Sequence, residues 1–419
     1  MTKPHAAARV IAAAICVFIL STSVSNRAPA DWPQWRGRNR DGISAEKGLL
    51  KSWPRGGPPL AWKAAGAGEG YSSFAVANGR LYTLGARGST EYVMAFDLAT
   101  GRKLWETAQG TRFSNDQGDG PRGTPVVDGN HLFALGASGD LSSIEAATGK
   151  IVWKVNVLRH FGGSNIRWGL SESPLVLPDR VLVAPGARGA AFAAFRKSDG
   201  NVLWKSGSDP AGYSSALFHP VGGVPQAIFF TAVRAVGVDT RDGRELWSYS
   251  RVANRTANIA TPIARGDRVF LSSDYGTGAA LLQLSATGNR VSASEIYFTN
   301  DMRNHHATAV LVGDHLYGFS SHILTAMRFD DAQVAWRDRS VGKGSLIFAD
   351  ERLYLFSERG VVGLAEATPS GYREHGRFEI RTGNSPTWSH PVVAEGKLFL
   401  RDQDMLYAYD VRAGSAPQK

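Results

Sequence analysis

A repeated strand–turn–strand unit constrains the fold of this chain more than any other feature. Its clearest copy is Ala-Phe-Asp-Leu-Ala-Thr-Gly-Arg-Lys-Leu-Trp at residues 95–105. The runs of β-branched and aromatic residues around it are too short for helices and are typical of strands. The Thr-Gly or Asp-Gly step supplies the positive φ that a tight hairpin needs. The repeat therefore predicts an all-β chain of many short antiparallel strands.

The aromatic residue near the end of each unit sets the period of the repeat. Successive copies lie 39 to 51 residues apart, a period typical of β-propeller blades. We predict eight four-stranded antiparallel blades, with the aromatic rings packed between blades rather than used for function. The eight aromatic positions are Trp62, Trp105, Trp153, Trp204, Trp247, Tyr297, Trp336 and Phe378.

The two ends of the repeated region complement each other. The last unit stops near Asp410 without its aromatic strand, whereas Leu60-Ala-Trp-Lys63 is an orphan strand of that type before the first unit. We predict that this N-terminal strand completes the last blade and removes an exposed sheet edge. The propeller then spans residues 60–412. An arm at 31–59, with Trp32 and Trp35, should pack against the propeller wall, and we expect residues 413–419 to be a disordered tail.

The first thirty residues resemble a targeting segment. Lys3 and Arg9 precede an apolar run at 10–20, and Ala28-Pro-Ala30 is a typical cleavage signal. We predict a signal peptide over residues 1–30, cleaved near Ala30, and a periplasmic or secreted mature protein. The apolar run is short for a membrane span, so we expect no transmembrane segment in the mature chain. An uncleaved membrane anchor is the alternative.

The remaining composition excludes several classes of protein. Cys16 is the only cysteine and lies in the predicted signal, so the mature chain has no disulfides, thiolate metal sites or C-x-x-C-H haem attachment. The net charge of +10 includes Lys3, Arg9 and Arg27 of the signal, and no dense basic run occurs. We therefore expect no nucleic-acid partner, and a monomer. Walker, G-x-S-x-G and H-E-x-x-H motifs are missing.

Specific motifs resemble a known family. The 95–105 unit resembles the tryptophan-docking repeat of pyrroloquinoline quinone (PQQ)-dependent dehydrogenases and of the non-catalytic propeller BamB. Four further segments are similar to exported bacterial PQQ-binding-like β-propeller repeat proteins. These are Asp-Trp-Pro-Gln-Trp-Arg-Gly at 31–37 with Asp41-Gly42, Arg303–His306, Gly342–Ser345 and Arg401–Asp404. The resemblance implies an eight-bladed propeller but no particular activity, because this superfamily contains both enzymes and scaffolds.

A ligand site is expected where the chain leads into the innermost strands. In a propeller these segments converge on the ring axis, and here they carry cations, aromatic rings and imidazoles. Such groups can pair with carboxylates, stack on a flat ring and exchange protons. They predict a small planar anionic ligand, although the same residues could instead hydrate the channel and cap strand ends. The candidates are Arg122, Glu172, Tyr213, Asn258, His305, His306, Lys343, Trp388 and His390.

Metal binding has less support in the sequence. His305 and His306 are adjacent, so in a strand they point to opposite faces, and a zinc ion would also need His390. The family resemblance implies another metal: PQQ alcohol dehydrogenases hold calcium and cofactor with a Glu, an Asn and a catalytic Asp. Glu172, Asn258 and Asp301 occur in that order. Those enzymes commonly also have adjacent cysteines and longer chains, which this sequence lacks.

Two functions follow from these observations. The first is a ligand- or protein-binding scaffold of the cell envelope, with no catalytic residue, whose partner is an envelope protein or a small planar anion. The alternative is a PQQ- and calcium-dependent oxidoreductase acting on an alcohol or sugar, with Asp301 catalytic and Glu172 and Asn258 on the metal. The missing cysteines favour the first function, and the polar mouth of the channel favours the second.

Overall fold

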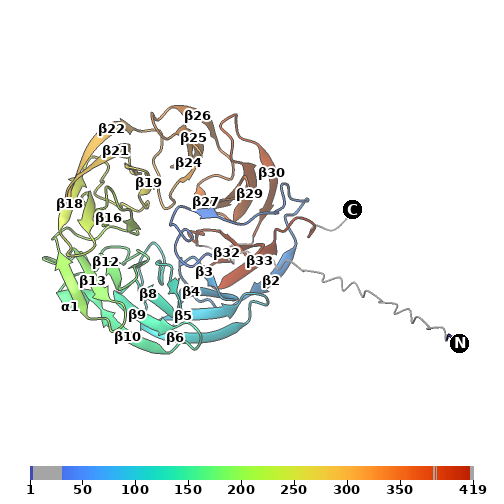
Figure 1. Ribbon diagram of the computed structural model, residues 1–419, viewed down its shortest axis with the longest axis horizontal. Coiled ribbons are helices and arrows are strands. Elements are labelled where there is room, and N and C mark those ends of the chain that lie inside the picture. Colours follow the sequence, from blue (N-terminus) through green and yellow to red (C-terminus); the bar gives the residue numbers. More distant parts are fainter. Residues whose placement is uncertain (3–30, 381–382, 384, 416–419) are drawn as a thin grey trace.

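The computed structural model shows a ring of eight antiparallel β-sheets around a central axis (Figure 1). It describes residues 1–2, 31–380, 383 and 385–415. The predicted eight-bladed all-β propeller is confirmed. The predicted signal peptide, apart from its first two residues, and residues 416–419 lie outside the described residues. Within the described part, no helix is long and apolar enough to cross a membrane.

The strands of each blade are given from innermost to outermost, which is also chain order except in blade 8, whose outermost strand comes from the N-terminal side of the ring. Blade 1 contains β3 (Ala75–Ala77), β4 (Arg80–Arg87), β5 (Thr90–Asp97) and β6 (Lys103–Thr111). Blade 2 contains β7 (Val126–Asp128), β8 (His131–Leu135), β9 (Asp140–Glu145) and β10 (Ile151–Asn156), followed by helix α1 (Val157–Phe161). Blade 3 contains β11 (Leu175–Val176), β12 (Arg180–Val183), β13 (Phe192–Arg196) and β14 (Val202–Ser206). Blade 4 contains β15 (Leu217–Phe218), β16 (Gln226–Phe230), β17 (Ala235–Asp239) and β18 (Glu245–Tyr249).

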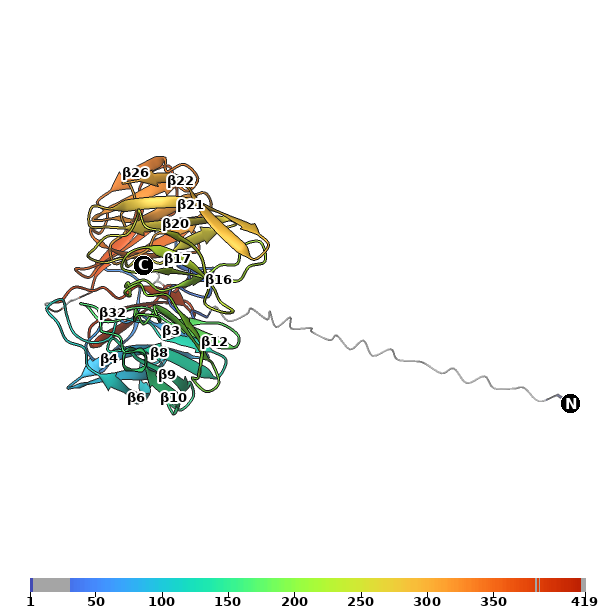
Figure 2. The same cartoon turned by 90° about the vertical axis from the view of Figure 1, so that its left-hand side faces the viewer.

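The second half of the ring follows the same plan. Blade 5 contains β19 (Ile263–Arg265), β20 (Arg268–Ser273), β21 (Gly278–Thr287) and β22 (Arg290–Thr299). Blade 6 contains β23 (Val310–Val312), β24 (His315–Ser320), β25 (Ile323–Arg328) and β26 (Val334–Asp338). Blade 7 contains β27 (Gly344–Ala349), β28 (Arg352–Ser357), β29 (Val361–Glu366) and β30 (Glu374–Glu379). Blade 8 contains β31 (Val392–Ala394), β32 (Lys397–Asp402), β33 (Met405–Asp410) and β2 (Leu60–Ala64). Figure 2 shows the ring from its side, with the long β21–β22 hairpin projecting beyond the other blades.

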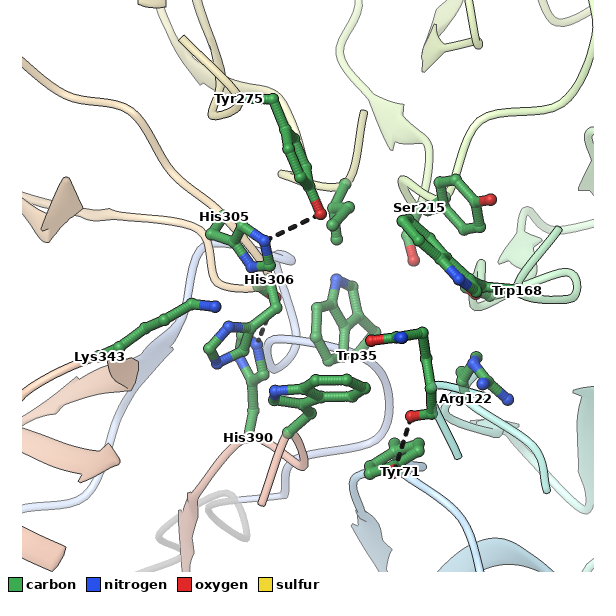
Figure 3. A pocket seen from close by; sticks show the side chains of 15 residues that line it. Trp35, Tyr71, Arg122, Trp168, Ser215, Tyr275, His305, His306, Lys343 and His390 are labelled. Atoms are coloured by element: carbon green, nitrogen blue, oxygen red, sulfur yellow. Dashed lines mark hydrogen bonds between the residues drawn. The ribbon is translucent and has the colours of Figure 1, made fainter. Parts of the chain in front are cut away.

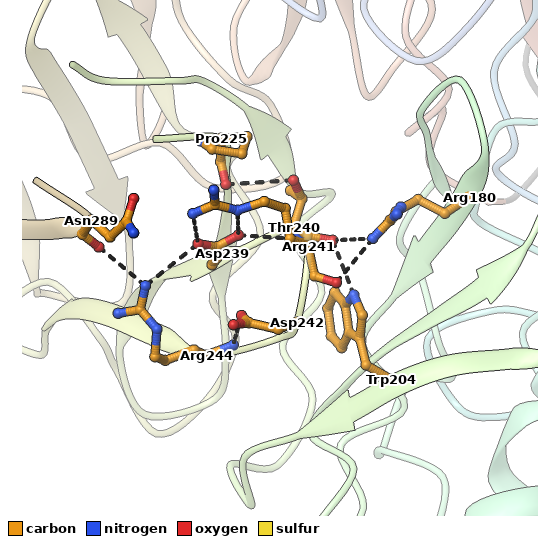
Figure 4. Close-up of polar contacts among 9 residues, drawn as sticks. All are labelled: Arg180, Trp204, Pro225, Asp239, Thr240, Arg241, Asp242, Arg244 and Asn289. Carbon is orange, nitrogen blue, oxygen red and sulfur yellow. Dashed lines mark hydrogen bonds and ion pairs between the residues drawn. The ribbon is translucent and has the colours of Figure 1, made fainter. Parts of the chain in front are cut away.

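A tryptophan on the outer strand of one blade docks onto the next blade. Figure 4 shows this contact for Trp204 of blade 3, whose Nε1 donates to the carbonyl oxygen of Thr240 at 3.0 Å. Its ring covers Gly243, where φ is +79° and a Cβ would come within 2.4 Å of the indole. The buried Asp239 carboxylate accepts hydrogen bonds from Arg241 and so holds the turn. The aromatic rings therefore pack between blades, as predicted. The same contact recurs for Trp62 on Gly101, Trp105 on Gly149 and Trp153 on Gly200.

The N-terminal strand closes the ring, as predicted. β2 pairs antiparallel with β33, with Leu60 opposite Tyr409. The chain before β2 also supplies the docking glycine that the end of blade 8 lacks. At Gly57, φ is +95° and a Cβ would lie 2.6 Å from the ring of Phe378 in blade 7. Past residue 412, Ala413 still donates its N–H to the carbonyl oxygen of Gly48 at 2.8 Å, so the ordered chain extends into the expected tail.

The arm corrects one expectation from the sequence. Trp53 does pack on the propeller wall, against Tyr354 and Phe378. Residues 32–44, however, cross the middle of the ring (Figure 1, blue). There, β1 (Ile43–Ser44) adds as a parallel strand to the inner edge of β27. Hydrogen bonds cause this path, because the innermost strands present unpaired backbone groups to the axis and the arm satisfies some of them.

Two buried arginines fasten the arm to distant blades. The Arg36 guanidinium donates to the carbonyl oxygens of Thr308 and Ala309 in blade 6, at 3.0 and 2.8 Å. The Arg40 guanidinium donates to the carbonyl oxygen of Ala216 in blade 4 at 2.8 Å, and to that of Pro174 in blade 3. Burial lowers the pKa of each arginine to about 10, so both stay charged at neutral pH. The arm thereby closes one end of the axial channel.

Candidate functional site

One residue from each blade lines a cavity of about 300 Å³ at the other end of the channel. These residues occupy equivalent positions. Each lies six residues before the first member of the residue pair that closes the first hairpin of its blade; in blade 1, Tyr71 lies six residues before Ala77, which pairs with Arg80. We call them the axial ring. It consists of Tyr71, Arg122, Ser171, Tyr213, Ile259, His306, Lys343 and Trp388. The cavity therefore gathers side chains from the whole propeller.

The arm supplies the bottom of this cavity. Figure 3 shows Trp35 at its centre, with Arg122 and Tyr71 on one side and His305, His306 and Lys343 on the other. The Trp35 indole packs on the His390 ring with centroids 4.4 Å apart, and its Nε1 donates to Thr261 Oγ1 at 2.9 Å. The remaining lining residues are Gln117, Trp168, Ser215, Tyr275, His305 and His390. The channel is thus converted into a pocket with a single mouth.

A second ring lies two residues further along the chain in each blade. Seven blades place a hydroxyl there, and several of these hydroxyls link neighbouring inner strands. Ser173 Oγ, for example, accepts from the N–H of Thr124 in the preceding blade at 2.8 Å. Blade 8 differs, because His390 replaces the hydroxyl and its Nε2 lies 3.3 Å from the carbonyl oxygen of His306. The seven hydroxyl residues are Ser73, Thr124, Ser173, Ser215, Thr261, Thr308 and Ser345.

Arg122 provides an uncompensated positive charge on one wall. Its guanidinium donates to the carbonyl oxygens of Gly118 and Gly120 at 2.8 and 2.6 Å. It also lies 5.5 Å from the Tyr71 ring centroid and 5.2 Å from that of Phe113. Burial lowers the pKa of Arg122, yet a guanidinium remains charged at neutral pH. In the described part of the chain no carboxylate forms an ion pair with Arg122, although the charges of Glu91 and Asp119 act to raise its pKa.

The opposite cation is neutralised. Lys343 Nζ lies 2.9 Å from Glu358 Oε1, and the same oxygen accepts from Trp388 Nε1 at 2.7 Å. His306 Nδ1 is 3.6 Å from this carboxylate oxygen. Glu358 is not itself in the lining of the cavity. The carboxylate holds Lys343 and Trp388 in place, so Arg122 is left as the free positive charge of the pocket.

The three histidines of the pocket are neutral at pH 7. Burial lowers the pKa of His305 to about 4 and that of His390 to about 3, and it holds that of His306 well below its usual range. His305 Nε2 contacts the Tyr275 hydroxyl at 2.9 Å. Among the described residues, His305 Nδ1, both nitrogens of His306 and His390 Nδ1 form no hydrogen bond. These buried nitrogens therefore lack hydrogen-bond partners within the protein.

Seven of the nine ligand-binding candidates line the cavity, but Glu172 and Asn258 do not. Glu172 follows Ser171 directly but points away from the cavity, where its Oε1 accepts from the Ala184 N–H at 2.5 Å. Burial raises the pKa of Glu172 to about 8. The Asn258 side chain stabilises a turn, accepting from the Asn254 N–H at 3.0 Å. Both side chains have structural partners. The seven in the cavity are Arg122, Tyr213, His305, His306, Lys343, Trp388 and His390.

The calcium site implied by the family resemblance does not fit these residues. Asp301, the third candidate, forms an ion pair with Arg337 at 2.5 Å and does not line the cavity. Glu172, Asn258 and Asp301 are therefore not brought together around one point of the pocket. In the part of the chain that the structure describes, no three His, Cys, Asp or Glu residues are arranged to hold a metal ion.

Sequence reasoning missed several residues of the cavity. Trp35 belongs to the arm, whose path across the axis has no local signal. Tyr275 lies in the loop between β20 and β21. Ser171 and Ile259 carry no obvious chemistry, although counting back from each hairpin would have found them. Tyr71 and Trp168 lie in the segments expected to face the axis but were not among the chosen residues.

Comparison with known proteins identifies the family. Residues 89–338 match the family described as "Outer membrane protein assembly factor BamB". The chain belongs to this family. A curated relative of the same name from Shewanella oneidensis is 24% identical over 229 residues, which are 52% of this chain and 53% of the relative. This BamB-family chain thus spans about half the length of the curated relative it matches.

Solved structures share the fold of this BamB-family chain. BamB from Moraxella catarrhalis has a TM-score of 0.56 and 13% identity, over 81% of this chain and 94% of that one. Quinohemoprotein alcohol dehydrogenase from Comamonas testosteroni has a TM-score of 0.63 and 12% identity, over 93% and 82%. At such identities the likeness concerns the fold alone, and it extends both to an assembly factor and to an enzyme.

Proposed function

We propose that this protein is an exported binding propeller of the cell envelope whose axial cavity takes a small planar anionic molecule. The observation that carries this proposal is the composition of the axial ring around Arg122. Positions that are structurally equivalent in all eight blades converge on one pocket with almost no repetition of side chain. A channel that needed only to be hydrated or capped would not require this diversity.

The aromatic residues support a flat ligand. Tyr71 and Trp388 have ring centroids 4.8 Å apart, and Trp168 and Tyr213 have centroids 5.4 Å apart. These pairs flank the Trp35 floor and offer π-faces to a planar ring. The cavity volume of about 300 Å³ is at the lower end of the range for small-molecule pockets. The ligand is therefore no larger than a few fused rings.

The charges support an anion. Arg122 has no ion pair, and no carboxylate is among the described residues that line the pocket. A carboxylate on the ligand can accept hydrogen bonds from a guanidinium that is already oriented by two backbone carbonyls. The same lack of carboxylates argues against a calcium–quinone centre. We therefore propose binding without a catalytic role for Asp301.

The biological setting follows from two further points. The predicted signal peptide would export the chain to the periplasm or beyond, and the family is named for outer-membrane protein assembly. We propose that the protein acts as a monomer in the envelope, in contact with a partner protein.

Titration of the purified mature protein with PQQ, a planar tricarboxylate, tests the ligand class. Quinone absorbance and the melting temperature are followed in EDTA and in calcium, since a ligand of the native state raises apparent stability. We expect binding in both conditions. Arg122→Gln should weaken binding about tenfold, because it loses a charge-assisted hydrogen bond. The exposed Arg290→Gln, on the β21–β22 turn, is the matched control.

Two outcomes would contradict the proposal. A strict requirement for calcium would restore the oxidoreductase as the better interpretation. No change in melting temperature with PQQ or with a panel of planar mono- and dicarboxylates would show that the pocket does not take planar anions.

A further inference from the structure

The arm-side end of the channel exposes a row of backbone groups. The innermost strand of each blade pairs on one side only, so its other edge faces the axis. One residue before the pair that closes the first hairpin, each blade has a non-hydrogen-bonded pair, whose N–H and C=O groups point away from the second strand. These axis-facing residues are Val76, Val127, Val176, Phe218, Ala264, Leu311, Phe348 and Val393.

The arm forms hydrogen bonds with the axis-facing residue of four adjacent blades, 7, 8, 1 and 2. Val76 in blade 1 exchanges two hydrogen bonds with Trp32, at 2.8 and 3.0 Å. The N–H of Val127 in blade 2 donates to the carbonyl oxygen of Pro33 at 2.8 Å. In blade 7, Phe348 N–H donates to Gly42 at 2.9 Å. In blade 8, the carbonyl oxygen of Val393 accepts from Ser44 Oγ at 2.8 Å.

The other four blades, 3 to 6, keep this position open. Within the described residues, no hydrogen bond reaches the axis-facing groups of Val176, Phe218, Ala264 or Leu311. All four residues line a second cavity, of about 500 Å³, which the arm separates from the pocket above Trp35. An unpaired strand edge is a template for another extended chain. The molecule itself demonstrates this mode, because β1 adds to the edge of β27 with Ile43 opposite Phe348.

The walls of this cavity combine apolar surface with three arginines, Arg38, Arg40 and Arg265, and one carboxylate, Asp41, which accepts a hydrogen bond from the Ile43 N–H. Leu175, Leu217 and Ile263 are among its apolar walls. Arg38 lines the cavity with its side chain 64% exposed, and its nearest carboxylate, Asp31, lies 3.8 Å away. Arg40 lines it as well and bonds to carbonyl oxygens and to the Gln34 amide, with no ion pair among the described residues. A carboxylate in the cavity can contact the exposed Arg38, whereas the buried Arg40, whose guanidinium is occupied by carbonyl oxygens, acts on it through its charge alone.

We infer that this cavity is a socket for the carboxyl-terminal end of an extended polypeptide from a partner protein. Because the arm closes the cavity on the inner side, a chain end fits better than a chain that must pass through. The positive charge of Arg38 and Arg40 selects the carboxyl end over the amino end. The inserted residues add to the free edge of one inner strand of blades 3 to 6, as β1 adds to β27. This inference does not depend on the ligand of the axial cavity.

Fluorescence anisotropy with the mature full-length protein tests the socket. The probe is the synthetic peptide Ser-Val-Thr-Ile-Val, labelled at its amino terminus and carrying a free carboxyl end. We expect saturable binding, and about tenfold weaker binding of the same peptide with a terminal amide, because the amide loses the charge-assisted contact. PQQ added in excess should leave the peptide affinity unchanged.

Two variants locate the site. Ala264→Pro removes an axis-facing N–H without removing a bond to β20, a substitution that edge strands tolerate. It should weaken the peptide about fivefold, the value of one backbone hydrogen bond, when the peptide lies on β19 of blade 5; unchanged affinity places the peptide on one of the other three strands. Arg38→Gln, an exposed substitution with little risk to folding, should weaken it about twofold. Arg290→Gln is the matched control and should bind the peptide like the wild type.

Backbone hydrogen exchange decides where the peptide lies. Protection confined to the inner strands of blades 3 to 6 supports the socket. Protection at β27, which would mean displacement of the arm, overturns it. Equal affinities of the acid and amide peptides, or no anisotropy change at millimolar protein, would also overturn it.

Discussion

The outer wall and the axial ring of this propeller use blade repetition in opposite ways. On the wall, the same tryptophan-on-glycine contact joins successive blades, as for Trp204 on Gly243. Around the axis, eight equivalent positions carry seven different residue types, and only tyrosine occurs twice, at Tyr71 and Tyr213. Repetition marks the positions that hold the blades together, whereas divergence marks the positions that are free to bind. Four sets of substitutions test this contrast, in order of decreasing expected effect.

Trp204→Ala should cost the most stability. It removes a buried ring from the contact between blades 3 and 4, a loss of about 3–5 kcal/mol. Urea denaturation measures the change. Trp204→Phe keeps most of the packing but loses the hydrogen bond to Thr240, and should cost about 1–2 kcal/mol. Folded Trp204→Ala should bind PQQ in the axial cavity like the wild type. Weaker binding would show that the outer wall and the axial ring do not act independently.

Glu172→Gln should change the pH dependence of stability. The folded-state pKa of Glu172, about 8, lies above the ordinary value of 4.5. Its stabilising contribution is therefore complete below pH 4.5 and is lost as pH rises through 8, by on the order of 3 kcal/mol. The variant should lack this loss when unfolding is measured between pH 5 and 9. Ser171→Ala, at the neighbouring axial position, should keep the wild-type profile. Parallel profiles for Glu172→Gln and the wild type would contradict the prediction.

His390→Ser gives blade 8 a hydroxyl like those of the other seven blades. His390 has a pKa of about 3, below the ordinary 6.5, so its contribution is present above pH 6.5 and is lost as pH falls. The wild-type loss of stability between pH 7 and 5 should shrink by about 2 kcal/mol in the variant. Thermal denaturation across this range measures it. The exposed His160→Ser should show the wild-type loss.

Two glycines distinguish the energetic cost of a positive φ from the additional cost of a steric contact with a tryptophan ring. Gly101 has φ of +72° and lies under Trp62, where a Cβ would meet the ring at 2.5 Å. Gly79 has φ of +70° and no atom within 4 Å of such a Cβ. Gly79→Ala should therefore cost about 1 kcal/mol, and Gly101→Ala about 1 kcal/mol more. Equal losses of unfolding free energy in the two variants would show that the Trp62 ring moves away from the new methyl group at no energetic cost.

The sequence predicted most of the fold and the greater part of the site. Repeated local signals, namely the aromatic strand and its Gly turn, fix the blade count and the closure by Leu60–Ala64, because each blade folds by the same short-range rules. Seven of the nine candidate residues line the axial cavity for a related reason. They lie in the segments leading into innermost strands, and in a closed ring those segments must meet at the axis.

The tertiary structure decided which side each residue faces and where the arm runs. Ser171 and Glu172 are neighbours in the segment leading into β11, yet only Ser171 lines the cavity, while Glu172 points to the Ala184 N–H. Trp35 became the floor of the pocket because Arg36 and Arg40 bind carbonyl oxygens of blades more than 130 residues away in the chain. Hydrogen bonds between such distant residues leave no local pattern in the sequence. The sequence by itself therefore determined the ring of blades, and only the folded ring, with the arm bound across it, determined the pocket.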